Sequence, residues 1–564
     1  MSIPRATLLV VVMFINIGVL SGASKKPVRA SRGMVVSADS MASAIGVAVL
    51  KKGGNAIDAA VAVGFTLAVT YPEAGNIGGG GFMLVRLADG RTTMIDFREQ
   101  APFAAHRDMY LDSAGEVRSG ASENGSLSAG VPGTVAGLLL ALERYGSFDR
   151  EEVLEPSIML AERGFRVDRQ LAESLGEFSV DFNKYSSSQT AFTRNGILRQ
   201  GDILKQEDLA RTLKAISDEG EKGFYEGKVA ELIVAEMDRG GGIISRQDLA
   251  SYSAVERVPL RGLYRGYEIL TSPPPSAGGV VVLQTLNMLE QFDLRRMEIG
   301  SSRSLHVFAA ATQRSYADRA VYLGDPDFVE MPLAELLSKE YATERARTVD
   351  SLQATPSTRI HAGQLEETEG QQTTHYCVVD GFGNVVSATV TLNGFYGSKT
   401  VVGGAGFFLN NEMDDFVVKP GTPNMYGLVG GEANAIAPRK RMLSSMAPTI
   451  VLKDGKPFMA VGGRGGSRIS TAVAQVIMNV IDYDLNMQEA IDWPRIHHQW
   501  LPDRIFYEPH GLPPDVRNNL TRMGYSLELT FDHNGRCQAL MIDPLNGEFL
   551  GAPDPREEGV AIGY

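Results

Sequence analysis

The chain has 564 residues, a formal net charge of −13 and an apolar content of 44%. Such a composition is typical of a globular protein, and the length suffices for more than one hydrophobic core. The negative charge, without a basic stripe interleaved with aromatic residues, argues against nucleic acid as a partner. Cys377 and Cys537 are the only cysteines, which excludes a disulfide framework and a four-cysteine metal site.

The first 23 residues are predicted to be a secretory signal peptide. Arg5 precedes the apolar run 8–20, and Ser21-Gly22-Ala23 supplies the small residues of a cleavage site. The run is short for a membrane span, although an uncleaved anchor helix is the alternative. We therefore expect the mature protein to begin near Ser24, to be periplasmic or secreted, and to have no stable membrane span.

Two helices and a hairpin are predicted next. Ser40 can cap a helix that runs to Val49, and residues 56–69 form an alanine-rich apolar helix suited to burial. Strands at 83–87 and 92–97 are separated by a short turn, which is typical of a hairpin. The glycines at 78–81 lack the spacing and the lysine of a phosphate-binding loop, so we expect a close-packed turn there.

The middle of the chain, residues 140–345, is expected to be mainly helical, with helices that include 284–292 and 304–322. Residues 352–370 follow with proline, glycine and glutamate and no apolar period. This stretch is predicted to be exposed, with nothing to bury.

An apolar strand begins just after Thr373. The strand-like runs 376–379 and 385–392 flank the turn 380–384, which predicts a hairpin. The sequence leaves a single disulfide between Cys377 and Cys537 possible. Because Cys377 falls in this predicted core strand, however, we expect two unpaired, buried thiols.

The last third repeats the pattern of hairpin and helix. Strands 449–452 and 458–461 flank a turn, and apolar residues between Ile469 and Val480 are spaced for one helix face. Helices that bracket paired hairpins suggest two antiparallel sheets between helical layers. The predicted fold class is therefore α+β, a four-layer αββα sandwich.

Thr373 stands where the exposed segment becomes a strand. A threonine hydroxyl is a poor nucleophile near neutral pH unless a base lies beside it. If the chain were cut before Thr373, the new α-amine, with an ordinary pKa of about 7.7–8.0, could be that base. From the residues alone, a threonine that merely begins a strand is the simpler interpretation.

Several motifs along the chain together resemble the γ-glutamyltransferases, or glutathione hydrolases, which are self-cleaving N-terminal-nucleophile enzymes. The resemblance follows the family order from end to end. The runs that carry it are Gly75 to Met83, Asp96-Phe97-Arg98-Glu99, Pro273 to Gly279, Gln372 to Asp380, Thr391-Leu392-Asn393, Leu409 to Phe416, Leu443-Ser444-Ser445-Met446, Gly465-Gly466-Ser467-Arg468, His497 to Trp500 and Ala552 to Arg556.

The resemblance implies the N-terminal nucleophile hydrolase fold, built jointly from two halves of a precursor. Cleavage between Gln372 and Thr373 would give a large subunit, residues 24–372, and a small subunit, residues 373–564, that stay together as a heterodimer. Thr373 would attack Gln372 first and a γ-glutamyl carbonyl later. Thr391 would hold its hydroxyl, and the amides of Gly465 and Gly466 would form the oxyanion hole. Without the resemblance, Thr391 is a strand residue and the glycines are a tight turn.

The resemblance also implies a site for the glutamyl group. Its α-carboxylate needs donors and its α-ammonium needs acceptors. A lid loop between Lys419 and Pro448 would close over the site. The implied substrate-binding residues are Arg98, Ser444 and Ser445 for the carboxylate, Asn393, Glu412 and Asp415 for the ammonium, and Tyr426 in the lid.

The implied reaction cleaves glutathione and other γ-glutamyl compounds and transfers the glutamyl group to water, amino acids or peptides, without a metal or organic cofactor. His497 and His498 point to opposite faces of a strand, which disfavours a metal site. A cephalosporin or glutaryl acylase of the same fold is the alternative enzyme, but it needs no ammonium receptor. A non-enzymatic exported binding protein would need no cleavage.

Overall fold

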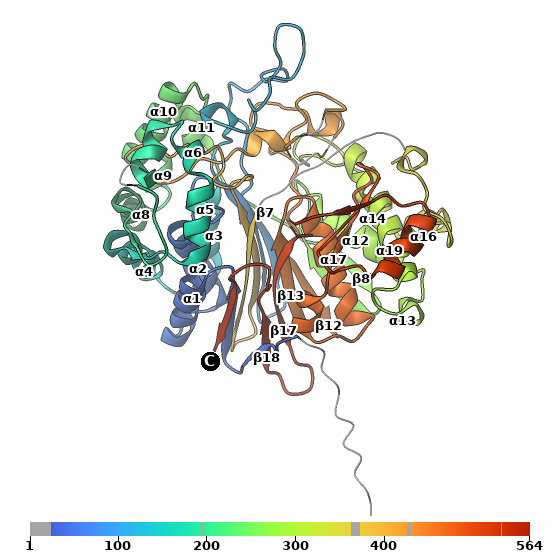
Figure 1. Cartoon of the computed structure of the whole chain (residues 1–564). Helices are drawn as coiled ribbons and strands as arrows, with labels where there is room; N and C mark the ends of the chain where they lie inside the picture. Colours follow the sequence, from blue (N-terminus) through green and yellow to red (C-terminus); the bar gives the residue numbers. More distant parts are fainter. Residues whose placement is uncertain are drawn as a thin grey trace, which may run out of the picture.

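The computed structural model describes residues 24–193, 196–362, 373–422, 424–425, 428, 430–531 and 533–564. Two antiparallel sheets lie face to face at the centre, and helices cover the outer face of each (Figure 1). The predicted αββα sandwich is confirmed. The signal peptide prediction, Gln372 and Tyr426 fall outside the described residues. Within them, no helix combines the length and apolar character needed to cross a membrane.

The first sheet has seven strands and holds the segment that begins after Thr373. β10 pairs on one side with β2 and on the other with β11, which then pairs with β3. The strand order is β19 (Val560–Gly563), β2 (Gly33–Ser37), β10 (Thr374–Asp380), β11 (Val385–Thr391), β3 (Gly80–Arg86), β4 (Thr92–Asp96) and β7 (Val255–Arg257).

The second sheet also has seven strands, and β12 and β13 at its centre form the predicted hairpin. Its order is β1 (Val28–Ala30), β18 (Phe549–Ala552), β17 (Arg536–Ile542), β13 (Lys456–Arg464), β12 (Thr449–Lys453), β9 (Tyr267–Thr271) and β8 (Leu260–Tyr264). Both sheets contain strands from before and from after Thr373. A cut before Thr373 would therefore leave the two halves interleaved.

One helical layer covers the first sheet, and a second layer covers the other sheet (Figure 1). The first layer and its neighbours are α1 (Ser40–Lys52), α2 (Ala56–Thr70), α3 (Thr134–Tyr145), α4 (Arg150–Arg163), α5 (Arg169–Glu177), α8 (Glu207–Glu219), α10 (Gly227–Gly240) and α11 (Arg246–Ser251). The second comprises α12 (Gly278–Leu289), α14 (Ser302–Tyr322), α16 (Lys339–Arg347), α17 (Arg468–Ile481), α18 (Met487–Asp492) and α19 (Pro514–Arg522).

The alternation of side chains along the strands builds two cores. In β10, Tyr376 and Val378 belong to the core under the first helical layer, whereas Cys377 and Val379 belong to the core shared by the two sheets. Successive strand residues point to opposite faces, so a strand covered on both sides is apolar throughout. Cys377 and Cys537 are both buried and free, as expected.

The N-terminal ends of two helices differ from the sequence prediction. Asp39, not Ser40, caps α1, because its carboxylate accepts a hydrogen bond of 2.7 Å from the Ala42 amide. α12 begins at Gly278, where backbone packs against backbone: a methyl group there would come 2.3 Å from the Met446 carbonyl oxygen. A tertiary contact of this kind leaves no periodic signal in the sequence.

The segment before Thr373 is not wholly exposed, so that prediction is wrong for its described part. Ile360 and Ala362 are buried, and they pack with Trp500 and with Tyr316 of α14. The Trp500 indole donates to the Ile360 carbonyl at 2.8 Å. Two isolated apolar residues are too few to give a period, which is why the pattern missed them.

Candidate active site

Thr373 and Thr391 lie at the same end of the first sheet. Thr373 immediately precedes β10, whose first residue, Thr374, is paired with Val390, and Thr391 ends β11. Both threonines are buried. A cavity of about 260 Å³, including its open mouth, joins them to most of the residues predicted for the site. Its lining residues are Arg98, Thr373, Thr391, Asn393, Glu412, Asp415, Leu428, Ser444, Ser445, Met446, Gly466, Ser467 and Ile469.

The glycine run before β3 lets the chain pass directly beneath Thr391. A methyl group on Gly79 would come 1.9 Å from the Thr391 carbonyl oxygen, so only glycine fits there. The same carbonyl accepts a hydrogen bond of 2.8 Å from the Asn76 side chain. These contacts confirm a close-packed turn, and they fix the strand end that carries Thr391.

The chain leaves β11 through Asn393, which has a φ of 70°. Asparagine tolerates this left-handed conformation better than most residues. The Asn393 amide donates to the Thr391 hydroxyl oxygen at 2.8 Å, and its side chain donates to the Asn411 carbonyl at 3.0 Å. The turn therefore ties the strand end to the short helix η4 (Glu412–Asp415).

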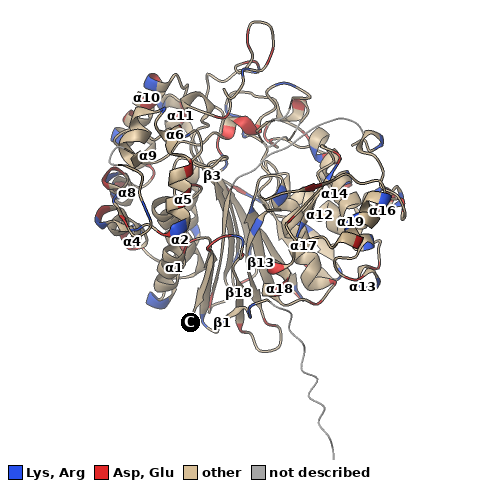
Figure 2. Cartoon of the chain, in the orientation of Figure 1, with Lys and Arg blue, Asp and Glu red and all other residues tan. Residues whose placement is uncertain are grey.

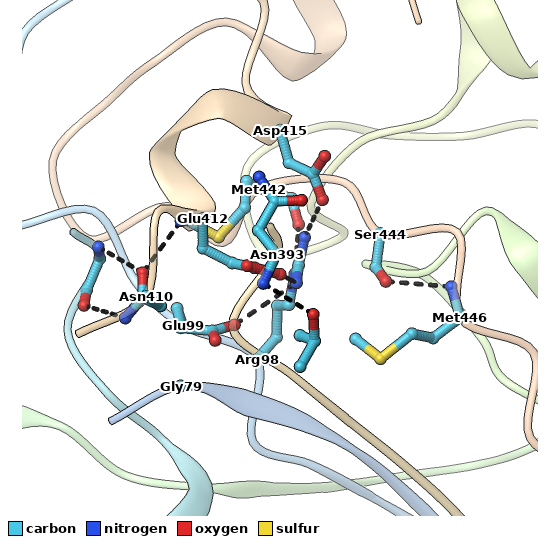
Figure 3. A network of polar contacts seen from close by, with 12 residues as sticks. Gly79, Arg98, Glu99, Asn393, Asn410, Glu412, Asp415, Met442, Ser444 and Met446 are labelled. Atoms are coloured by element: carbon cyan, nitrogen blue, oxygen red, sulfur yellow. Dashed lines mark hydrogen bonds and ion pairs between the residues drawn. The ribbon is translucent and has the colours of Figure 1, made fainter. Parts of the chain in front are cut away.

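Arg98 forms the centre of a buried polar network (Figure 3). Its guanidinium donates to the Met442 carbonyl at 3.1 Å and to Glu99 at 3.4 Å, and it forms short ion pairs with Glu412 and Asp415. Burial alone would lower the pKa of Arg98, but the carboxylates outweigh it and raise that pKa above its usual value. Arg98, predicted for the substrate carboxylate, is thus paired with Glu412 and Asp415, which were predicted for the ammonium.

The network holds three carboxyl groups, those of Glu99, Glu412 and Asp415, but one guanidinium, that of Arg98. Burial raises the pKa of Glu99 to about 8 and the pKa of Glu412 well above its usual value. It also raises the pKa of Asp415, and in all three cases it outweighs the attraction of Arg98, which lowers the pKa. Among the described residues, one oxygen each of Glu99 and Glu412 is buried without a hydrogen-bond partner. Unpaired buried carboxylate oxygens are costly, so the site is poised to accept a cation.

Sequence reasoning did not assign Glu99 and Asn410. The Asn410 side chain donates to the carbonyls of Gly78 and Gly130 at 2.9 and 2.8 Å, and accepts from the Glu412 amide at 3.0 Å. It anchors η4 against the turn below Thr391 (Figure 3). Both residues stand in the runs that carry the family resemblance, which is the one signal that could have indicated them.

Ser444 and Ser445 also line the cavity. Ser444 is held by backbone hydrogen bonds of 2.8 Å to Pro275 and Ala277, and its hydroxyl accepts from the Met446 amide at 3.1 Å. The donor hydrogen of that hydroxyl is then available to a ligand. In the described structure the Ser445 hydroxyl has no protein partner, so it can donate as well.

Gly465 and Gly466 lie between β13 and α17. Their φ angles are 133° and 55°, a region that disfavours other residues. Their carbonyls accept from the Arg468 and Ile469 amides at 3.1 Å, whereas their own N–H groups donate to no acceptor in the part of the chain that the structure describes. Free amides at a helix N-terminus attract negative charge, and Gly466 lines the cavity.

The family profile described as Gamma-glutamyltranspeptidase matches residues 42–564. The "Glutathione hydrolase proenzyme" of Escherichia coli is 49% identical over 541 residues, which are 95% of this chain and 93% of that protein. A crystal structure of cephalosporin acylase from Bacillus halodurans superposes with a TM-score of 0.84 at 27% identity, over 98% of this chain and 99% of that one.

A chain of the Helicobacter pylori gamma-glutamyltranspeptidase structure matches 62% of this chain and 99% of its own length, with 45% identity and a TM-score of 0.58. The profile and the E. coli relative both span nearly the whole chain. The chain belongs to the gamma-glutamyltranspeptidase family.

Proposed function

We propose that the protein is a self-processing γ-glutamyltransferase that cleaves glutathione and related γ-glutamyl amides. The observation that carries the substrate assignment is the buried excess of carboxylates beside Thr373. Glu99, Glu412 and Asp415 surround the guanidinium of Arg98, and two of their oxygens have no hydrogen-bond partner among the described residues. A ligand with an ammonium group would supply the missing positive charge.

The glutamyl group also carries an α-carboxylate, for which Arg98, Ser444 and Ser445 are the donors in this proposal. The ammonium would take over part of the contact that Glu412 and Asp415 now make with Arg98. This exchange would turn a guanidinium fork toward the substrate carboxylate. The γ-carbonyl would then lie toward Thr373 and Gly466, which share the cavity.

Maturation begins at the same hydroxyl. Thr373 Oγ1 adds to the carbonyl carbon of Gln372, the C–N bond breaks, and an ester replaces the amide while the nitrogen becomes a free amine. Water then hydrolyses the ester, which leaves a new carboxylate on Gln372 and an N-terminal Thr373. The products are a large subunit of residues 24–372 and a small subunit of residues 373–564. Removal of residues 1–23 and export belong to the same proposal.

Catalysis uses the new terminus. The Thr373 amine takes the hydroxyl proton as Oγ1 attacks the γ-carbonyl, and the Gly465 and Gly466 amides receive the developing oxyanion. The proton passes to the leaving amine, and a γ-glutamyl ester forms on Thr373. Attack by water or by an acceptor amine breaks that ester and restores the hydroxyl. In this proposal Thr391 holds the Thr373 hydroxyl in one rotamer by a hydrogen bond. The proposal also assigns Tyr426 to the lid.

A denaturing gel with N-terminal sequencing tests processing, and release of p-nitroaniline from γ-glutamyl-p-nitroanilide tests activity. We expect two fragments, the smaller beginning at Thr373, and expect Thr373→Ala to give one inactive chain. Active uncut protein, or an active Thr373→Ala variant, would contradict the proposal.

A cephalosporin or glutaryl acylase is the second candidate, because the Bacillus halodurans acylase has the same fold over nearly the whole chain. A glutaryl group has no α-ammonium, so it would leave the carboxylate excess uncompensated. Turnover of a glutaryl amide at the rate of the matching γ-glutamyl amide would favour this candidate.

A further inference from the structure

Arg319 is a buried arginine on α14 that has no partner in the described structure. It is 5% exposed, its side chain forms no hydrogen bond or ion pair there, and its Nε is fully buried without an acceptor. Arg314, five residues earlier on the same helix, is also buried, but it donates to Thr348 at 2.6 and 2.7 Å and to Ala310 at 3.0 Å. Buried cations are nearly always paired, so the free guanidinium of Arg319 indicates an absent anion.

The face of α14 that holds Arg319 backs the wall of the cavity. Tyr316, Arg319 and Ala320 are spaced i, i+3 and i+4 and therefore share one side of the helix. The Tyr316 hydroxyl donates to the carbonyl of Ser467, which lines the cavity. Arg319 thus lies one turn from a direct contact with the active-site wall.

The other side of Arg319 faces the loop after η4. The Ala320 carbonyl accepts a hydrogen bond of 2.9 Å from the Gly431 amide. Leu428 of that loop lines the cavity and packs against the cluster that contains Tyr316 and Ala320. Arg319 therefore lies between the wall segment that holds Ser467 and the loop that holds Leu428.

The electrostatics at this position favour an anionic ligand. Burial lowers the pKa of Arg319, while Tyr316 and the negative charge of Asp415 act in the opposite direction. The Nη atoms have no acceptor among the described residues either, and unlike Nε they keep some accessible surface. A carboxylate that reached them would pair with a cation that is already largely desolvated, which makes the interaction strong.

We propose that Arg319 binds the carboxylate on the leaving-group side of the scissile bond, the terminal carboxylate of the amino acid or peptide that a γ-glutamyl donor releases. This inference rests on the proposed function. Among the described residues that line the cavity, Arg98 is the single cation, and in the proposed function it serves the α-carboxylate of the glutamyl group. A donor such as glutathione brings a second carboxylate, for which Arg319 is the unpaired cation nearby. An acceptor that enters as the leaving group departs would use the same contact.

The test compares two donors in the mature enzyme. Glutathione has a carboxylate on its leaving group, and γ-glutamyl-p-nitroanilide has none. In Arg319→Gln, we expect the ratio of kcat/KM for glutathione to that for the anilide to fall at least roughly tenfold. Arg319→Lys should recover part of the ratio, because it keeps the charge. The control, Arg303→Gln at an exposed position of the same helix, should leave the ratio at its original value.

A second measurement needs no variant. With γ-glutamyl-p-nitroanilide as donor, the wild-type enzyme should have a KM for the acceptor glycylglycine roughly tenfold below that for glycylglycine amide, which lacks the carboxylate. Equal acceptor KM values, or an equal loss with both donors in Arg319→Gln, would overturn the assignment. Failure of the wild-type enzyme to turn over either donor would instead refute the proposed function.

Discussion

The two walls of the cavity are built from different parts of the fold. The Thr373 wall consists of strand ends and a helix N-terminus, and it offers hydroxyls and backbone amides without an ionised side chain. The Arg98 wall consists of loops and the short helix η4, and it gathers charged groups (Figure 3). In Figure 2, acidic residues mark the region of η4 above the sheets. Rigid strands can position reacting atoms, whereas loops can rearrange around a charged ligand.

This division predicts that changes on the Thr373 wall act on maturation and kcat, and that changes on the Arg98 wall act on KM. The largest effect belongs to Thr373→Ala, which removes the nucleophile. We expect an uncut chain and a loss of activity of at least about 10³-fold. Thr373→Ser is the matched control: it keeps a hydroxyl and should still be processed. An intact Thr373→Ser chain would show that the wall needs more than a hydroxyl at this position.

Asp415→Asn should have the next largest effect. It keeps the shape of the side chain but removes a charge that pairs with Arg98 and, in our proposal, with the substrate ammonium. Loss of one partner of a buried charge pair costs about 2–5 kcal/mol, so KM should rise roughly 10²-fold or more with a smaller change in kcat. Steady-state kinetics with γ-glutamyl-p-nitroanilide measure both.

Asp414→Asn is the charge-matched control. The Asp414 carboxylate accepts hydrogen bonds from the Ser122 hydroxyl at 2.6 Å and from the Met425 amide at 2.8 Å. Asp414 is not among the cavity-lining residues. Asp414→Asn should therefore raise KM much less than Asp415→Asn does. Equal effects of the two variants would show that net charge, not position, governs this wall.

Ser445→Ala removes one hydroxyl donor that has no protein partner in the described structure. A hydrogen bond to a charged group contributes about 1.5–3 kcal/mol, so KM should rise about tenfold while processing stays complete. A gel and initial rates check both parts. A Ser445→Ala variant that stayed uncut would place Ser445 with the nucleophile wall and break the comparison.

The smallest effect is a pH dependence of ligand affinity. Because burial raises the pKa of Glu99 to about 8, its carboxyl group is protonated below that pH in the empty site. An ammonium ligand favours the ionised form, so binding releases a proton and affinity for glutamate should rise with pH up to about 8 and then level off. Calorimetric titration with glutamate at several pH values measures this. Glu99→Gln should flatten the curve, and a wild-type affinity independent of pH would contradict the assignment.

Sequence patterns predicted the strand wall better than the charged wall. The hairpin of β10 and β11 and the helix α17 follow from local alternation and periodicity, so Thr373, Thr391 and Gly466 were placed correctly at element ends. The pairing of Arg98 with Glu412 joins residues 314 positions apart. No local pattern encodes such a contact, and only the family resemblance brought these residues together.

The misjudged segments have the same cause. The burial of Ile360 against Trp500, and the packing of Gly278 against Met446, both depend on partners far away in the chain. The roles assigned to individual site residues stay predictions, which the variants described above test.

The most direct test of the central claim is mass spectrometry of the small subunit after rapid acid quenching during turnover of a γ-glutamyl donor. The account predicts a fragment that begins at Thr373 and carries one glutamyl group, with the modification located at Thr373 after digestion. A glutamyl group on any other residue, or turnover by a chain still joined at Gln372, would contradict it.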